Sequence, residues 1–385
     1  MSQYRSIFLD AVNRRQRPAL GAIYRVLVGG VEILSAEKTK LGRQRIEINV
    51  VDQAIEIEAS LAGWESQRIH LQPGRNDWTF TFAGAGVPSV LMVCALPKET
   101  AAVLATFDSY VEDAVAAPVE DPNKYWIGSF GSQDDGGPRR VLVATCGMGI
   151  VGAAITATHA LRSFPQDINQ IVMVGIAGGC PNRLKAEEHV RLGDVVVANE
   201  KGVVQYDFIK RTIDGDEHRA DPQRPSKEML DAAQTLEIRR LSGGVAPWKP
   251  WVEKGIKALP GFRRPRPSTD VLYEGKTIVT HPRDSSRRSG SPRIHRGAIG
   301  SANILLKEPK QRDKVRDRWG VRAIEMEGSG VMDAGWAMNK DVMVVRGICD
   351  YCDSHKNKVW QNYAALVAAA YARCIVEALP QQVLP

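Results

Sequence analysis

The chain has 385 residues, and its 44% hydrophobic and 25% charged residues are typical of a globular protein, which excludes a mostly disordered or fibrous chain. No stretch approaches the run of about 18 apolar residues that a membrane-spanning helix needs, and the opening Met1-Ser-Gln-Tyr-Arg5 lacks the layout of a signal peptide. The formal net charge of +7 is small for this length and no aromatic and basic stripe accompanies it, so nucleic acid is not an expected partner.

Residues 1–86 alternate apolar and polar side chains, and they predict a small all-β module. Ile46, Ile48 and Val50, for example, are separated by polar residues. Such period-two alternation, bounded by turn residues, is typical of half-buried antiparallel strands. Because nothing in the module resembles a site, we expect it to regulate the protein or to bind a protein partner.

The rest of the chain, residues 87–385, alternates predicted strands with predicted helices. Continuous apolar runs predict strands at 89–96, 140–146, 171–176, 194–199 and 342–348. Apolar residues at helical spacing predict helices at 100–116, 150–161, 226–241 and 359–378. This order indicates an α/β fold with a mixed, mostly parallel sheet flanked by helices. The less regular, Arg-rich stretch at about 205–296 is interpreted as an insertion.

The cysteines indicate a reducing compartment. All six are scattered and most lie inside apolar runs, which is typical of cytoplasmic proteins rather than of a disulfide framework. Cys349 and Cys352 have CxxC spacing, but a zinc or redox site would need a second pair or a thioredoxin-like context. We therefore expect a cytoplasmic protein with no metal and no cofactor.

Five segments with glycines or acidic residues follow or end predicted strands. In open α/β sheets, ligands bind at the edge where the carboxyl ends of the strands meet. The segments are Cys94–Glu99, Cys146–Gly152, Val174–Gly179, Ala323–Gly328 and Gly347–Asp350.

Taken in this order, these segments resemble the purine nucleoside phosphorylase and nucleosidase superfamily, in its methylthioadenosine/S-adenosylhomocysteine nucleosidase-like branch. The resemblance covers roughly residues 88–380, and it rests on Gly-Ile-Ala-Gly-Gly179, Leu192–Ala198, Glu325-Met-Glu327 and Arg346–Asp350. It is strongest to versions of this domain found in fungal fusion proteins and in bacterial defence systems. It implies the nucleoside phosphorylase fold, an adenine nucleoside or nucleotide as ligand, and a homo-oligomer.

The resemblance implies that Asp350 is the acid that protonates the leaving purine, a role that calls for a raised pKa. The alternative is that Asp350 caps the last helix. Glu327 would accept hydrogen bonds from the ribose cis-diol, because one carboxylate offers two acceptor oxygens. Met326 would pack on the ribose or in the core, and Glu325 would reach the nucleophile or ribose or remain a surface residue.

Glu99 decides the expected reaction type. By the resemblance, a Glu in the first strand-to-helix loop holds an attacking water, whereas phosphorylases carry Arg residues and a Gly-rich phosphate loop there. The alternative is a Glu that interacts with a helix dipole. Backbone near the purine and ribose would come from Ala177, Gly178, Gly179 and Gly149, and Arg346 is expected to bind substrate.

The insertion carries an arginine cluster that suits phosphate oxygens. Its members are Arg283, Arg287, Arg288, Arg293 and Arg296. If they hold a 5′-triphosphate, the protein would resemble the antiviral nucleosidases that convert ATP to adenine and ribose 5-triphosphate. If they form only a solvated loop, the expected activity is hydrolysis of a purine nucleoside. A phosphate-dependent phosphorylase, a salvage nucleosidase and a non-catalytic nucleotide sensor remain the alternatives.

Overall fold

The computed structural model describes residues 5–12, 22–29, 31–38, 44–48, 53–60, 66–81, 89–112, 121–131, 139–165, 168–219, 221–243, 246–288, 290–355 and 357–380. Two compact units make up the chain. The first comprises Met1–Val90, Phe107–Val143 and Ser163–Asp167, and the second comprises Leu91–Thr106, Ala144–Arg162 and Ile168–Pro385. The expected domain boundary at residues 86 and 87 lies outside the described residues.

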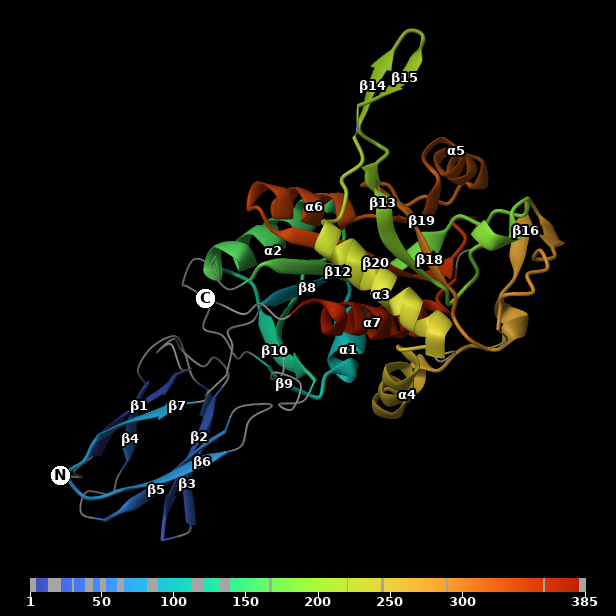
Figure 1. The fold of residues 1–385 in the computed structure, drawn as a ribbon. Coiled ribbons are helices and arrows are strands. Elements are labelled where there is room, and N and C mark those ends of the chain that lie inside the picture. The colour runs from blue at the N-terminus through green and yellow to red at the C-terminus, as the bar shows by residue number, and fades with distance from the viewer. Residues whose placement is uncertain are drawn as a thin grey trace. The chain divides into compact units, whose positions relative to one another are not determined.

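The part of the first unit before residue 89 consists of two small β-sheets, as predicted (Figure 1). One sheet has the order β4-β1-β7, with β1 at Arg5–Val12, β4 at Gln44–Ile48 and β7 at Asp77–Thr81. The other has the order β3-β2-β5-β6, with β2 at Ile23–Val28, β3 at Val31–Lys38, β5 at Ile55–Ser60 and β6 at Gln67–Leu71. Apolar side chains of both sheets, among them Leu9, Tyr24, Ile57 and Phe80, share one core.

The prediction of a helix over 100–116 is wrong from residue 107 to residue 112, and residues 113–116 lie outside the described residues. Helix α1 (Pro97–Thr106) ends early, and β9 (Ser109–Glu112) then pairs antiparallel with β10 (Tyr125–Phe130). Phe107 packs edge-on against Phe130, with ring centroids 4.6 Å apart, over a surface left open by Gly128. Tyr110 and Val111, whose spacing suggested a continuing helix, therefore lie in a strand pair.

Most strands of the central mixed sheet belong to the second unit, whereas β9, β10 and most of β11 belong to the first. Strands β18 and β19 and most of the helices after residue 243 were not predicted. The strands of the sheet have the order β19-β18-β13-β20-β12-β8, and β11, β10 and β9 complete nine strands. Their bounds are β8 Val90–Cys94, β11 Arg139–Thr145, β12 Gln170–Gly179, β13 Val195–Gln205, β18 Ile294–Ser301, β19 Val321–Glu325 and β20 Asp341–Asp350.

Strand pairing brings the polar segments to one edge of the sheet. β12 and β20 are parallel, so Gly178 pairs with Asp350 at their carboxyl ends. β19 also pairs antiparallel with β12, where Gly178 lies opposite Ile324. Five strands thereby close on themselves, and the ends of β12, β19 and β20 meet.

Helices cover the sheet on both sides (Figure 1). α7 packs on β12 and β20 and against α1 and α3, while α6 contacts β12, β13 and β20. The remaining bounds are α2 Ile150–Ser163, α3 Lys227–Gly243, α4 Lys249–Ala258, α5 Pro309–Trp319, α6 Gly328–Ala337 and α7 Gln361–Ala378. Two hairpins project outward, formed by β14 Ile209–Thr212 with β15 Gly215–His218 and by β16 Leu272–Glu274 with β17 Thr277–Val279. Within the described ranges, no helix has the length and apolar character required to span a bilayer.

Candidate functional site

A cavity of about 240 Å³ lies where β8, β12, β19 and β20 end. It brings together seven of the residues that sequence reasoning selected: Glu99, Ala177, Gly178, Glu325, Met326, Glu327 and Asp350. It also includes lining residues that were not selected, namely Ala95, Leu96, Met148, Ile176, Leu305, Ile324, Cys349 and Gln361. Four carboxylates therefore share one small, partly apolar space.

Glu99 is held by backbone donors in the first turn of α1. Its side chain is buried, and Oε2 accepts hydrogen bonds from the N–H groups of Ala95 and Leu96, both at 2.8 Å. Oε1 accepts from the N–H of Ile176 at 2.7 Å. A carboxylate offers about four acceptor positions, so these three bonds leave one for a ligand or water.

Arg346 is the buried cation behind the cavity. It lies in β20 and is fully enclosed, and its Nη2 contacts the carboxylates of Glu325 and Glu327, the latter at 3.2 Å. A Cβ at Gly175 would collide with Arg346 Nη1 and would lie 2.7 Å from Glu99 Oε1. Gly175 is therefore required for Arg346 and Glu99 to approach the same stretch of β12.

Glu325 and Glu327 play different parts at the start of α6. Glu325 accepts hydrogen bonds from the N–H groups of Glu327 at 3.1 Å and Gly328 at 2.7 Å, and its side chain has no exposed surface. Glu327 uses Oε1 to accept from the N–H of Gly149 at 3.1 Å, and Oε2 faces Arg346. By the same count of acceptor positions, Glu327 keeps about two for a ligand, which matches a cis-diol.

The charges in the site are unbalanced, because four carboxylates accompany one guanidinium. Burial raises the pKa of Glu99, and this outweighs the lowering by Arg346 and by the three N–H donors. Burial raises the pKa of Glu327 to about 7; repulsion by Glu325 and Glu99 adds to the effect and Arg346 opposes it. Although burial alone would lower it, the surrounding carboxylates raise the pKa of Arg346. Glu327 is thus poised to exchange a proton near neutral pH, and Glu99 is a stronger base than an exposed glutamate.

Asp350 ends β20 and is buried. Its Oδ1 accepts a hydrogen bond from the N–H of Cys352 at 2.9 Å, and the Cys349 thiol donates to Oδ2 at 3.2 Å. A Cβ at Gly178 would lie 2.9 Å from Oδ1, so glycine is needed beside this carboxyl. The alternative role as a helix cap is excluded, because α7 begins at Gln361 and takes Trp360 as its N-cap.

Two glycines that were expected to approach the substrate, Gly149 and Gly179, are not among the residues that line the cavity. Gly149 has a φ of +107°, a conformation that favours glycine, and its N–H donates a hydrogen bond to Glu327. Gly179 packs closely against Ile348 and Val190 and does not line the cavity. Asn303, which was not selected, accepts a hydrogen bond from the N–H of Ile150 at 3.0 Å.

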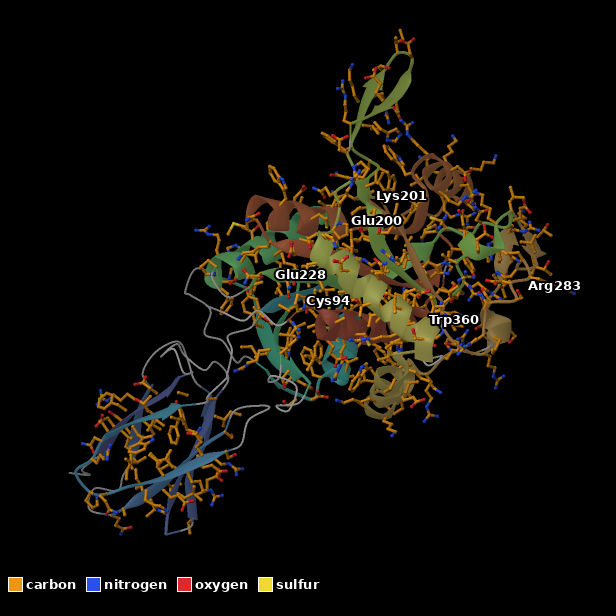
Figure 2. The ribbon with its side chains drawn as sticks, in the orientation of Figure 1. Cys94, Glu200, Lys201, Glu228, Arg283 and Trp360 are labelled. Carbon is orange, nitrogen blue, oxygen red and sulfur yellow. The ribbon has the colours of Figure 1, made fainter. Side chains whose placement is uncertain are left out.

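The five arginines selected as phosphate ligands lie outside this lining. Figure 2 shows Arg283 near the outer edge of the second unit, well away from Cys94 at the end of β8. Three of the five bind carboxylates: Arg287 binds Asp194, Arg293 binds Asp284 and Arg296 binds Glu200. Arg287 and Arg288 line two further cavities, of which one also contains Arg293 and the other Arg283.

The arrangement can bind a polar ligand and move protons. Among the residues that the structure describes, no group of three or more His, Cys, Asp or Glu side chains is placed to hold a metal ion. Glu99 and Glu327 offer open acceptor positions, and Asp350 lines the same cavity at the end of β20. Apolar side chains such as Leu96, Met148 and Leu305 complete the cavity.

Comparisons with known proteins agree with this geometry. Residues 89–379 match the family described as the phosphorylase superfamily. A nucleotide-binding leucine-rich repeat (NLR)-like protein of Hyaloscypha variabilis is 32% identical over 320 residues, which cover 77% of this chain and 30% of that protein. The 5′-methylthioadenosine/S-adenosylhomocysteine nucleosidase of Mycobacterium bovis is 26% identical over 294 residues, covering 76% of this chain and 97% of the enzyme.

Two further proteins extend the comparison. The ATP nucleosidase Cap17 of Escherichia coli is 25% identical over 289 residues, covering 73% of this chain and 50% of that protein. This chain therefore spans less than a third of the fungal relative and half of the bacterial one. Among solved structures, the Neisseria meningitidis 5′-methylthioadenosine/S-adenosylhomocysteine nucleosidase, in complex with methylthio-immucillin-A, aligns with a TM-score of 0.52 and 15% identity, covering 76% of this chain and all of that one. At this identity the likeness concerns the fold alone.

Proposed function

Because this chain belongs to the phosphorylase superfamily, we propose that it hydrolyses the N-glycosidic bond of an adenine nucleoside or nucleotide. One observation carries the choice of hydrolysis over phosphorolysis. Of the described residues that line the cavity, four are carboxylates and none is Arg, Lys or His. A phosphate nucleophile would be repelled by such a lining, whereas water would not.

In the proposed reaction, Glu99 and Glu327 act through the acceptor positions that the backbone leaves open. Glu327 accepts hydrogen bonds from the two ribose hydroxyls. Glu99 orients a water and takes its proton as the water oxygen attacks C1′, a role that its raised pKa favours. Glu325, whose acceptor positions are occupied by backbone N–H groups and by Arg346, positions that guanidinium.

Asp350 completes the proposed reaction on the side of the base. The C1′–N9 bond breaks, its electron pair moves to the purine, and Asp350 delivers a proton to N7. The products are the free base and a sugar with a hydroxyl at C1′. Met326, Ala177 and Gly178 line the space in which the nucleoside would be held.

We further propose that the substrate includes ATP. Sequence similarity to an ATP nucleosidase supports this, as does one cation beside the cavity, since Lys98 Nζ donates to Gln361 Oε1 at 2.8 Å and Gln361 lines the cavity. A role in antiviral defence, a homo-oligomeric state and binding of a protein partner by residues 1–86 belong to the same proposal. So does the division into a β module at 1–86 and a catalytic domain at 87–385 with an insertion at about 205–296.

Base release from ATP, AMP, adenosine and methylthioadenosine, with and without phosphate, tests the proposal. Chromatography should detect adenine from at least one of them in the absence of phosphate. Release from ATP would support the defence role, and release from the uncharged nucleosides alone would point to salvage. Strict dependence on phosphate would establish a phosphorylase, and tight binding without release would indicate a sensor.

A further inference from the structure

A groove of about 790 Å³ lies beside the carboxyl end of α5, and none of its lining residues lines the carboxylate cavity. Residues 182–188, 200–201 in β13, 222–224 and 316–322 form its walls. The charged side chains among them are six cations, Lys185, Lys201, Arg224, Arg316, Arg318 and Arg322, and three carboxylates, Glu188, Glu200 and Asp317. Positive charge is therefore in excess.

The three carboxylates of the groove already have cationic partners. The pairs are Glu188 with Arg322 at 2.9 Å, Glu200 with Arg296 at 3.0 Å, and Asp317 with Arg316 at 2.8 Å. Lys185 also reaches Glu188, at 3.6 Å. Since each carboxylate is engaged, the remaining cations of the groove have no counter-charge in its walls.

These remaining cations are Lys201, Arg224 and Arg318. Within the ranges that the structure describes, no carboxylate forms an ion pair with any of the three, and no group accepts a hydrogen bond from their side chains. The end of α5 offers Lys201 only the partial negative charge of a helix terminus, roughly half an elementary charge. The groove thus has three exposed positive charges that an external anion could bind.

The backbone brings the three cations to one place. Gly202 has a φ of +72°, and a Cβ there would collide with the carbonyl of Gln223 and lie 3.1 Å from the N of Arg224. The Lys201 ammonium lies against the end of α5, 3.0 Å from the position that a Cβ at Gly320 would take. Figure 2 shows Lys201 beside Glu200 and away from Cys94, the residue at the end of β8. Like charges held together repel one another, and an anion between them would remove that repulsion.

Trp319 adds a donor that lacks an acceptor. Its side chain lines the groove, packs edge-on against His218 with ring centroids 5.9 Å apart, and has the Arg318 guanidinium 5.3 Å from its ring centroid. The indole Nε1–H is buried and has no hydrogen-bond acceptor among the described residues. A buried N–H without an acceptor is costly, and buried Trp residues normally have one. A ligand oxygen would supply the acceptor.

We propose that this groove binds a polyphosphate, an anion with two or more linked phosphate groups, through Lys201, Arg224 and Arg318. Linked phosphates concentrate several negative charges in one compact ligand, which matches three cations in one groove. Successive carboxylates on one side of an extended acidic peptide would stand about 7 Å apart and match it less well. The volume of about 790 Å³ also lies within the roughly 300–1,000 Å³ of pockets that hold small molecules.

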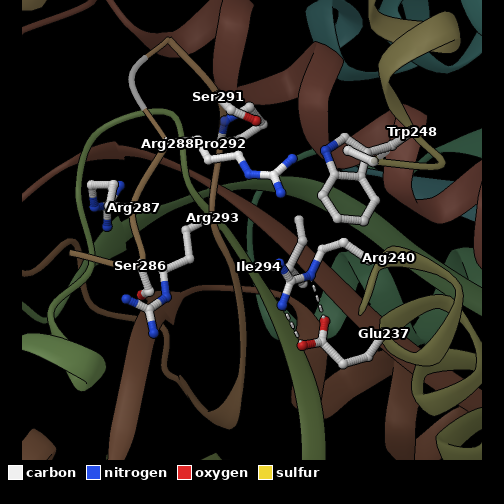
Figure 3. A pocket seen from close by; sticks show the side chains of 11 residues that line it. Glu237, Arg240, Trp248, Ser286, Arg287, Arg288, Ser291, Pro292, Arg293 and Ile294 are labelled. Carbon is white, nitrogen blue, oxygen red and sulfur yellow. Dashed lines mark hydrogen bonds and ion pairs between the residues drawn. The ribbon is translucent and has the colours of Figure 1, made fainter. Parts of the chain in front are cut away.

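The arginine-rich cavity between α3 and residues 286–294 does not fit such a ligand (Figure 3). Its volume of about 150 Å³ is too small for a whole polyphosphate. Glu237 also stands in its wall, where it accepts two hydrogen bonds from Arg240, at 2.7 and 3.0 Å. The groove beside α5 is therefore the better site, and it is independent of the proposed hydrolysis because it concerns different residues.

The polyphosphate is either inorganic or the 5′-triphosphate of a nucleotide. Calorimetric titration of the full-length chain at low ionic strength, with inorganic triphosphate and separately with UTP, tests the site and distinguishes these sources. UTP carries no purine, so it is not a substrate of the proposed hydrolysis. We expect saturable binding of at least one of the two, and the tighter ligand identifies the source.

Substitution of the exposed cations tests where the ligand binds. Lys201→Gln and Arg224→Gln should each weaken binding about fivefold or more, and the double variant should weaken it about 30-fold or more. Lys276→Gln is the matched control, because it removes one exposed positive charge from the hairpin of β16 and β17, outside the groove. It should change binding less than about twofold.

A second readout follows Trp319. Its indole N–H resonance, identified by its loss in Trp319→Phe, should shift when the ligand is added, and it should not shift in the double variant at the same concentration. Absence of saturable binding by both ligands up to about 5 mM would overturn the proposal. A double variant that binds as tightly as the natural protein would also overturn it.

Discussion

Replacing Glu327 by Gln should make the protein more stable while it destroys the site. Burial and the neighbouring carboxylates raise the pKa of Glu327 from 4.5 to about 7 in the folded chain. A group whose pKa is raised on folding stabilises the folded state below its unfolded pKa and loses that contribution as the pH rises through the folded pKa. The ionised Glu327 carboxylate therefore lowers the free energy of unfolding above pH 7.

The expected magnitude follows from the shift. One pKa unit corresponds to about 1.4 kcal/mol, so the full shift is worth roughly 3 kcal/mol. Gln resembles the protonated carboxyl, and it can still accept from the N–H of Gly149. Because the repulsion is distributed over several neighbouring carboxylates, the gain should be no larger than the full shift. We expect Glu327→Gln to raise the free energy of unfolding by about 1–3 kcal/mol at pH 8 and by little at pH 4.5.

Calorimetric unfolding of the natural protein and of Glu327→Gln at pH 4.5, 6 and 8 measures this difference. If the two units of the chain unfold independently, calorimetry also resolves their two transitions. Glu253→Gln is the control, because its side chain on α4 is 61% exposed and its change should stay within about 0.5 kcal/mol at every pH. A Glu327→Gln variant that is equally or less stable than the natural protein at pH 8 would refute the electrostatic account of the site.

Three further substitutions test individual parts of the site. Asp350→Asn should lower kcat for base release about 10²- to 10⁴-fold while adenine binding is retained, whereas the control Asp353→Asn, which is also buried, should keep most of the activity. Equal kcat values for Asp350→Asn and the natural protein would show that Asp350 is not the acid. Glu99→Gln places an NH₂ group against backbone N–H donors, so kcat should fall at least about 100-fold and the free energy of unfolding should fall by about 1–3 kcal/mol. A fully active Glu99→Gln variant would contradict the proposed role of Glu99. Gly175→Ala should displace Arg346 and lower the free energy of unfolding, measured by urea titration, by about 1–3 kcal/mol. The control Gly243→Ala, at a position with open space around it, should leave the free energy of unfolding unchanged. Similar urea unfolding curves for both variants would show that the close approach of Gly175 to Arg346 is unimportant.

Most residues of the site could be predicted from the sequence, because the carboxyl ends of parallel strands meet at one edge of the sheet. Glu99, Glu327 and Asp350 are far apart in the chain, yet they line one cavity. The same logic could not predict which groups neutralise them. Arg346 stands out only as part of a motif, and its enclosure by Glu325 and Glu327 depends on how β19 and β20 are placed.

Other elements escaped prediction for local reasons. Helix α6 begins Gly-Ser-Gly and resembles a loop in sequence, but its glycines serve close packing, since a Cβ at Gly330 would collide with the carbonyl of Ile150 and one at Gly335 with Val342. β19 has only five residues, too few to show a period. The arginine cluster was visible as charge, but its partners Asp194 and Glu200 lie about 90 residues earlier in the chain.

The most direct test of the central claim is the identity of the sugar product formed in the presence of phosphate. The chain would be incubated with ATP and with adenosine in phosphate buffer, and the products would be identified by mass spectrometry. The account predicts adenine with a sugar that carries a free hydroxyl at C1′, formed at the same rate when phosphate is omitted. A sugar 1-phosphate as the product would contradict it.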